Sequence, residues 1–347
     1  MRIVIATVRV PFSRGAADTL AAGLQGALQA AGHEAEIMAP PFTPSSAAAI
    51  PDQMLACRLM QARESSGVAI DRLIGLAFPA TLIPHPAKRL WLDGRYPPAY
   101  DGWMAGAGGL RDAPGGAHIR RAIHAADTAA LAESDAVYAV SHAAALLHSY
   151  AGIAATPLYH PPPNADRFAL AGWGDYVLAP EAVLTNASHG PILDALARTR
   201  APVRVCFLGV FATDEDAAAL SQRARTLALQ ERLQWHGPAS DADRAALFSH
   251  CLAVILADPG EGYSYCALEA MLSSKPVVTN PRAAGAAEFV VDGQTGFVCE
   301  PGPAALAGVL DRLWADRARA ARLGRAGRGH YADMRPGWDR VMECLLG

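Results

Sequence analysis

Two acidic residues, Glu261 and Glu269, lie eight positions apart in the stretch Gly260–Asn280. The preceding run Cys251–Ala257 is continuously apolar, as expected of a strand buried on both faces. A helical pattern follows from about Ser264. Glu261 is therefore predicted in a strand-to-helix loop, and Glu269 about a turn and a half into the helix.

The residues between these acids could bind an anion. Gly262, Tyr263, Ser264 and Tyr265 bring backbone N–H groups to a helix N-terminus, where phosphate binds readily. One carboxylate beside the reacting centre and a second on a ribose hydroxyl would suit a nucleotide-sugar site. The alternative interpretation is a solvated loop acid at Glu261 and a surface helix residue at Glu269.

Composition limits the class of protein. The 347 residues suggest about two domains, and 52% hydrophobic with 18% charged residues indicates a soluble globular chain with large cores. The net charge is -3 and the acids and bases are mixed, without the basic stripe that nucleic-acid binding requires. No apolar run approaches the about 18 residues of a transmembrane helix.

The N-terminus and the cysteines both point to the cytoplasm. The N-terminal segment is too short, and too interrupted by Arg9, for a signal peptide. The six cysteines are scattered without a C-x-x-C pair, so we expect reduced, mostly buried thiols of a cytoplasmic protein.

Strand and helix patterns alternate along the first half of the chain. The segments 2–8, 35–40, 72–78, 89–93 and 136–141 read as strands, and 20–33 and 119–135 as helices. The leucines at 20, 24 and 28 recur every four residues, which is typical of a helix with one buried side. The first strand, helix and second strand form a βαβ unit, so a parallel sheet begins at the N-terminus.

The segment 158–180 interrupts this alternation with three successive prolines and two glycines. A domain boundary is therefore predicted near residues 160–174. After it come strands at 176–180, 203–209, 233–237, 251–257 and 275–280, and helices at 191–199, 216–229, 243–250 and from Ser264. The segments 303–327 and 337–346 are also helical.

We therefore predict an α/β fold with two Rossmann-like domains facing a central cleft, the default ligand site. The expected domains are residues 1–165 and 166–328. Residues 329–347 are expected to form a C-terminal helix that packs back toward the N-terminal domain.

An ordered series of motifs resembles glycosyltransferase family 4, whose members are retaining enzymes of the GT-B fold. The series comprises Glu261, Glu269-Ala270-Met271, Lys275-Pro276-Val277-Val278, Gly285 before Glu288, and Asp292-Gly293-Gln294-Thr295-Gly296-Phe297. Counterparts of the first βα loop, of the 136–141 segment, of the proline-rich junction, of 233–237 and of the closing helix extend the resemblance to both chain ends.

The resemblance implies roles for these residues. Glu261 would lie against the transferred sugar, and Glu269 would hydrogen-bond the ribose. The amides of residues 262–265 would hold the diphosphate, and the same resemblance adds Gly15 and Gly237 to the nucleotide-binding set. The implied activity is transfer of a hexose from a nucleotide sugar, UDP- or GDP-linked, to a small molecule or glycan, without a metal or other cofactor.

The chain departs from the family pattern where the donor phosphates should bind. Family members carry an Arg and then a Lys after the first strand of the second domain, but Trp173–Ala197 contains neither residue type. These cations compensate the departing diphosphate, and losing one transition-state donor costs about 100- to 1000-fold in rate. Arg14, Arg95 and Arg282 are the predicted replacements, with Arg14 and Arg95 in catalytic roles.

No metal site is predicted. The run Asp214-Glu215-Asp216 has the form of a D-x-D motif, but it follows Thr213 at a predicted helix start, so helix capping is the better interpretation. Spaced His and Cys ligands are also lacking.

Three functions fit the sequence: a working glycosyltransferase, a GT-B scaffold adapted to an unusual donor or to a nitrogen or sulfur nucleophile, and a non-catalytic pseudo-glycosyltransferase. Retention of both glutamates favours the first two, and the missing cations favour the last two. The sequence leaves open a homo-oligomer or a partner glycosyltransferase subunit.

Overall fold

The computed structural model describes the whole chain except residues 13–14, 101, 105–108, 143–144, 146–154 and 258–261. The chain forms two compact units, one of Met1–His160 with Gly337–Gly347 and the other of Pro161–Pro336. The division falls within the proline-rich segment, after His160 instead of at residue 165. The tail joins the first unit at Gly337 instead of at residue 329, because the preceding helix belongs to the second unit and continues to Met334.

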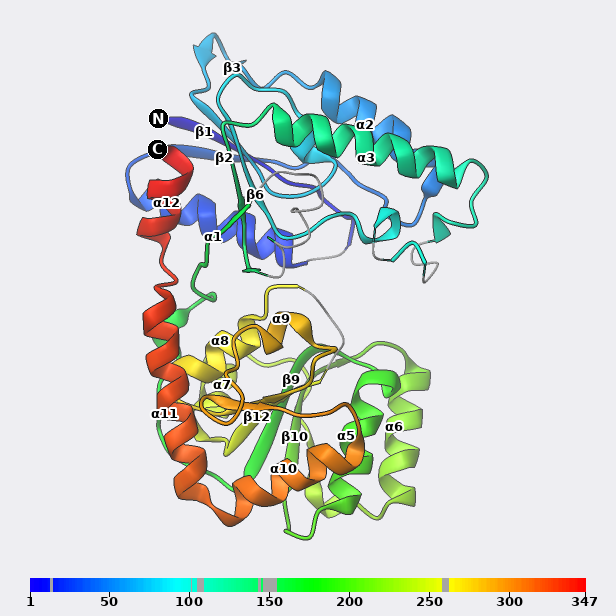
Figure 1. The fold of residues 1–347 in the computed structure, drawn as a ribbon, viewed down its shortest axis with the longest axis vertical. Coiled ribbons are helices and arrows are strands. Elements are labelled where there is room, and N and C mark those ends of the chain that lie inside the picture. Colours follow the sequence, from blue (N-terminus) through cyan, green and yellow to red (C-terminus); the bar gives the residue numbers. More distant parts are fainter. Residues whose placement is uncertain (13–14, 101, 105–108, 143–144, 146–154, 258–261) are drawn as a thin grey trace. The chain divides into compact units, whose positions relative to one another are not determined.

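The first unit contains a parallel sheet with strand order β2-β1-β5-β6-β7-β8 (Figure 1). Its central strands are buried on both faces, as Ile3, Val4 and Ile5 of β1 show. A short antiparallel hairpin, β3–β4, stands apart from this sheet. The strands are β1 (Arg2–Ala6), β2 (Glu34–Met38), β3 (Glu64–Ser65), β4 (Val68–Ala69), β5 (Arg72–Gly75), β6 (Lys88–Leu92), β7 (Ala136–Ala139) and β8 (Thr156–Pro157).

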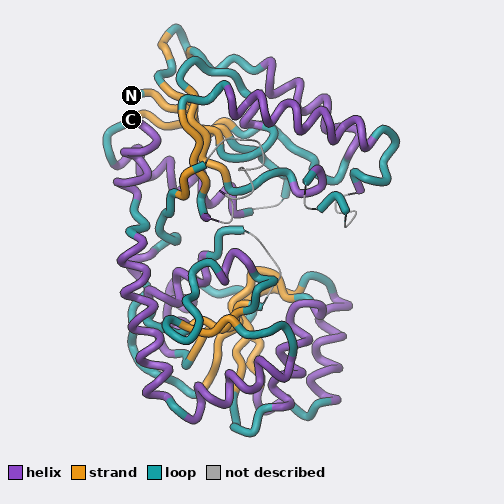
Figure 2. Tube along the Cα trace, viewed as in Figure 1, coloured by secondary structure: helices purple, strands orange, loops and turns teal. Residues whose placement is uncertain are grey.

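Helices cover this sheet on both faces (Figures 1 and 2). Leu20, Leu24 and Leu28 form the buried side of α1, which packs against α12. On the opposite face of the sheet, helices α2 and α3 form a core together with residues of β1 and β5. The bounds are α1 (Ala16–Ala30), α2 (Ile50–Leu59), α3 (Gly116–Ala132) and α12 (Trp338–Leu346).

The second unit has its own parallel sheet, with strand order β11-β10-β9-β12-β13-β14. The order reverses at β9, since the next two strands lie on one side of it and the last three on the other. This reversal places the switch point of a doubly wound sheet at the carboxyl ends of β9 and β12. The strands are β9 (Tyr176–Leu184), β10 (Arg204–Phe211), β11 (Leu233–Trp235), β12 (Ala253–Leu256), β13 (Val277–Thr279) and β14 (Gly296–Val298).

The helices of this unit also form two layers (Figure 1). Ile255, Val278 and Phe297 point into a core shared with α5, α6 and α10. Because side chains alternate along a strand, Leu256 and Thr279 point to the other face, where α8 packs on β12 and β13. The helices are α5 (Asn186–Arg198), α6 (Asp214–Thr226), α7 (Asp241–His250), α8 (Tyr265–Leu272), α9 (Ala284–Ala287), α10 (Pro303–Ala315) and α11 (Arg317–Met334).

The predicted α/β architecture of two Rossmann-like domains is confirmed. The predicted strands and helices all appear with shifted ends, and the predicted helical segment 303–327 divides into α10 and α11. The sequence interpretation missed β3, β4, β8, β14, α2 and α9. None of the helices in the described part of the chain is both long and apolar enough to span a membrane.

Candidate functional site

Helix α8 begins at the carboxyl edge of the second sheet, directly after β12 and beside the switch point. Such an edge is where ligands bind in open α/β sheets. The loop before α8 is described only from Gly262 onward. Glu261 lies outside the described residues, and so does Arg14 in the first unit.

The described part of the loop is anchored by packing. Tyr263 is buried, and its ring meets those of Tyr265 and Phe289 edge-on at 5.5 Å between centroids. Ser264 is the N-cap, with its Oγ accepting from the Ala267 amide at 3.3 Å. Gly262 is exposed, and apart from its chain neighbours no atom of the described residues lies within 4 Å of the position a Cβ would take. The loop therefore presents its backbone at the start of α8, as an anion site requires.

Glu269 is not a surface residue. Its side chain is 5% exposed, and it forms an ion pair with Arg244 of α7. Arg244 Nη2 donates to Oε2 at 2.6 Å, and Nε lies 3.1 Å from both carboxylate oxygens. The interpretation of Glu269 as a surface helix residue is therefore wrong, because its side chain is buried and paired with Arg244 of α7.

Burial and charge oppose each other in this pair. Burial raises the pKa of Glu269, while the Arg244 guanidinium acts to lower it. Burial also works against the charge of Arg244, but Cys266 and Glu269 outweigh it and raise the arginine pKa. The carboxylate thus depends on Arg244 for its charge compensation.

Arg244 and His236 are further candidate site residues, which the sequence interpretation did not name. His236 follows β11 and donates its amide to Phe207 O at 2.8 Å. Its Nδ1 is buried without a hydrogen-bond partner in the described part of the chain. Gly237 comes next, in the left-handed region at φ 64°. A His-Gly pair after a short strand was visible in the sequence, whereas the Arg244–Glu269 pairing joins two helices and carries no local signal.

The segment without Lys or Arg forms β9 and the start of α5. Thr185 caps α5, its side chain accepting from Ser188 N at 3.2 Å. His189 is buried, with Nδ1 3.1 Å from both the amide nitrogen and the carbonyl oxygen of Thr185. Local contacts thus hold the imidazole at the start of its own helix.

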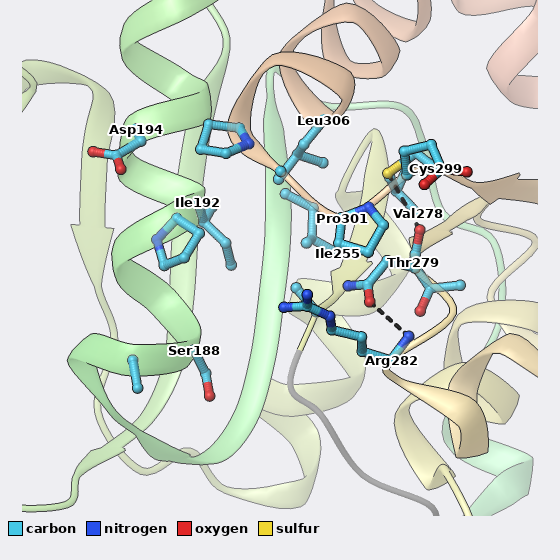
Figure 3. A pocket seen from close by; sticks show the side chains of 17 residues that line it. Ser188, Ile192, Asp194, Ile255, Val278, Thr279, Arg282, Cys299, Pro301 and Leu306 are labelled. Atoms are coloured by element: carbon cyan, nitrogen blue, oxygen red, sulfur yellow. Dashed lines mark hydrogen bonds between the residues drawn. The ribbon is translucent and has the colours of Figure 1, made fainter.

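Arg282 extends into a cavity of about 380 Å³ on the face of the sheet covered by α5 and α10 (Figure 3). Ile255, Val278 and Leu306 give the cavity apolar walls, and Ser188 lies at the start of α5 beside it. The Arg282 amide donates to Asn280 Oδ1 at 2.9 Å. Neutralisation of a diphosphate by Arg282 stays a prediction.

In the first unit, the predicted residues make local contacts. The amide of Gly15 donates to Asp18 Oδ2 at 2.9 Å, so a carboxylate already occupies the start of α1. Arg95 lies 4.0 Å above the ring of Tyr100, whose hydroxyl donates to Asp127 Oδ2 at 2.8 Å. Burial raises the pKa of Asp127 to about 6.

The acidic run 214–216 caps α6. Thr213 Oγ1 accepts from the Asp216 amide at 3.1 Å, and Asp216 Oδ1 accepts from Asn186 N at 2.7 Å. Its interpretation as a capping sequence is confirmed. Across the described residues, no group of three or more His, Cys, Asp or Glu side chains is placed to hold a metal ion. All six cysteines are free thiols, three buried and three partly exposed.

Residues 183–330 match the family model of glycosyl transferases group 1. A comparison with curated proteins gave no match.

Solved structures resemble the chain over its whole length. Sucrose-phosphate synthase from Thermosynechococcus elongatus is similar at a TM-score of 0.74 and 15% identity, covering 100% of this chain and 98% of that one. HepE from Anabaena in complex with UDP gives 0.72 and 16%, with the same coverage. A glycosyltransferase from Rickettsia africae gives 0.73 and 16%, covering 99% and 97%.

The fold is therefore that of the GT-B glycosyltransferases. The matched segment contains the whole constellation from Glu261 to Arg282 and lies in the second unit.

Proposed function

We propose that the protein transfers a sugar from a UDP- or GDP-linked donor to a small-molecule or glycan acceptor, with retention and without a metal. The observation that carries the proposal is the start of α8 at the switch-point edge, with buried Glu269 in its second turn. It lies inside the segment that matches the group 1 glycosyltransferase model. The structural neighbour HepE has been solved with UDP-glucose.

Each residue of the constellation receives a role in this proposal. The amides of residues 262–265 hold the diphosphate at the positive end of α8. Glu269, paired with Arg244, binds the ribose, and Gly237 and Gly15 allow close approach of the nucleotide. Arg14, Arg95 and Arg282 supply the positive charge absent from 173–197.

A thermal-shift screen with UDP, GDP, ADP, TDP and their sugars tests the donor. A ligand at a hundredfold excess over its Kd should stabilise the protein by about 2.7 kcal/mol. Incubating the stabilising sugar nucleotide with candidate acceptors then tests transfer. If none of these compounds shifts the unfolding transition, the proposed function is wrong.

Glu261→Gln tests the role of the first acid. Positive charge on the sugar develops only in the transition state, so the variant should lose at least about tenfold in kcat, roughly 1.4 kcal/mol, with nearly unchanged nucleotide affinity. Steady-state kinetics and titration calorimetry measure the two quantities. Equal turnover by both proteins would contradict the role given to Glu261.

A non-catalytic binding subunit is the second candidate. The absence of Lys and Arg from Trp173–Ala197 favours it, because a departing diphosphate needs compensation. This candidate predicts nucleotide binding without hydrolysis or transfer by any donor. Slow donor hydrolysis without transfer would instead indicate a live site, and nitrogen and sulfur nucleophiles should then be tried as acceptors.

A further inference from the structure

One edge of the Arg244 guanidinium is unused within the described structure. Nε and Nη2 donate to Glu269, and Nη2 also lies 3.2 Å from Cys266 Sγ. The guanidinium carbon lies 5.2 Å from the Phe248 ring centroid, one turn along α7. Nη1 has no hydrogen-bond partner among the described residues, and the side chain keeps 27% of its exposure. Arg244 can therefore hold Glu269 and still donate to a ligand.

Fold stability gives little reason to keep this pair. Removing two charges from water costs about as much as their attraction returns, so well-packed apolar replacements of buried ion pairs are often neutral or stabilising. Removing one partner alone is far more damaging, because it leaves an uncompensated buried charge. The Arg244–Glu269 pair is buried beside a candidate ligand site and has one donor left over. Ligand recognition therefore explains its presence better than fold stability does.

We propose that Arg244 positions Glu269 and itself reads the ribose of the bound nucleotide. This inference rests on the proposed function and deepens it. The fixed carboxylate has lone pairs left to accept from a hydroxyl, and the adjacent Nη1 donates to a hydroxyl oxygen. A hydroxyl both donates and accepts, so the pair matches the vicinal hydroxyls of a ribonucleotide. A deoxynucleotide leaves one of these buried polar groups unsatisfied, which is costly.

Titration calorimetry with UDP, GDP and their 2′-deoxy and 3′-deoxy forms measures this discrimination. The wild-type protein should bind the ribonucleotide about tenfold or more tightly than at least one deoxy form, as expected for a hydrogen bond to a charged group. Arg244→Leu should remove most of that preference. Because this variant leaves Glu269 buried and unpaired, the decisive protein is the double variant R244L/E269L.

The double variant separates recognition from folding. It should unfold at the wild-type temperature or above and bind ribo- and deoxynucleotides equally weakly. The matched control is R204Q/D175N, which removes the exposed Arg204–Asp175 pair near the amino-terminal ends of β9 and β10. This control should keep the wild-type preference.

Each other outcome overturns the inference. A double variant that fails to fold would make the pair structural, and one that still prefers the ribonucleotide would show that other groups read the ribose. Nucleotide binding by wild type without ribose discrimination would remove the inference alone. No nucleotide binding by wild type would remove the proposed function together with it.

Discussion

At the scale of single residues, the second unit is unusual because it buries ionisable side chains that most proteins keep at the surface. Lys275 has no exposed surface, although lysine is rarely buried. Its Nζ donates to Gly172 O and lies 4.1 Å above the Trp173 ring, so it ties the proline-rich segment to the sheet. Burial lowers the pKa of Lys275 to about 8, from 10.5.

This lowered pKa predicts a pH-dependent stability. Between about pH 8 and 10.5 the unfolded chain keeps the Lys275 proton that the folded protein has released, so the free energy of unfolding rises with pH there. The gain should approach roughly 3 kcal/mol. Lys275→Met lacks this term, so its stability relative to wild type should fall across the same window in urea titrations. Parallel pH profiles would contradict the burial of a titrating amine.

Part of the candidate site was predictable from the sequence, but the pairing of its side chains was not. The position of Glu269 in α8 and the loop before that helix followed from local patterns. Its partner Arg244 lies 25 positions away on α7, and only the tertiary fold of the second unit brings the two side chains together. Gly15 shows the same limit, since nothing in the sequence indicated that its amide donates to Asp18 of the same helix.

At the scale of elements, the sequence predicted the strands and helices whose hydrophobic pattern is regular over their whole length. Strands buried on both faces and helices with regular leucines were found. Helix α2 was missed, although Ile50, Met54 and Cys57 have helical spacing and are buried. Strand β14 is only three residues long and starts with Gly296, where a Cβ would lie 2.1 Å from Val277 O. The close approach of the two strands requires glycine at this position. A short strand that begins with glycine gives only a weak strand pattern in the sequence.

Two glycines of α1 provide a matched test of helix packing in the first unit. A Cβ on Gly23 would lie 2.7 Å from the Trp338 ring of α12, whereas nothing lies within 4 Å of a Cβ on Gly26. Gly23→Ala should therefore destabilise the protein by about 1–3 kcal/mol. Gly26→Ala should stabilise it by about 0.5–1 kcal/mol, because alanine favours the helix. Chemical denaturation measures both, and equal stabilisation would mean that α12 does not pack on α1.

At the scale of the whole molecule, the first unit is built from both ends of the chain. Trp338 of α12 lies 6.2 Å from the Trp91 ring and 5.6 Å from the His160 ring, between centroids. Arg89 Nη1 donates to Cys344 O at 2.5 Å, near the end of α12. Helix α12 thus completes a core that residues of the first 160 positions begin, and the first unit needs both segments.

A chain ending at Pro336 tests this dependence. Losing α12 exposes the Trp91–His160 contact and leaves Arg89 without its acceptor. The truncation removes the buried Val341 and Leu345 and the partly buried Trp338. Losing one large buried apolar side chain costs about 2–5 kcal/mol, so the transition of the first unit should fall by about 10 °C in scanning calorimetry. Arg340→Ala, at an exposed position of α12, should leave both transitions unchanged. The shift that a bound nucleotide gives to the second unit should persist in the shortened chain, because residues 161–336 are intact. A shortened chain that melts like the full protein would show that α12 adds nothing to the first core.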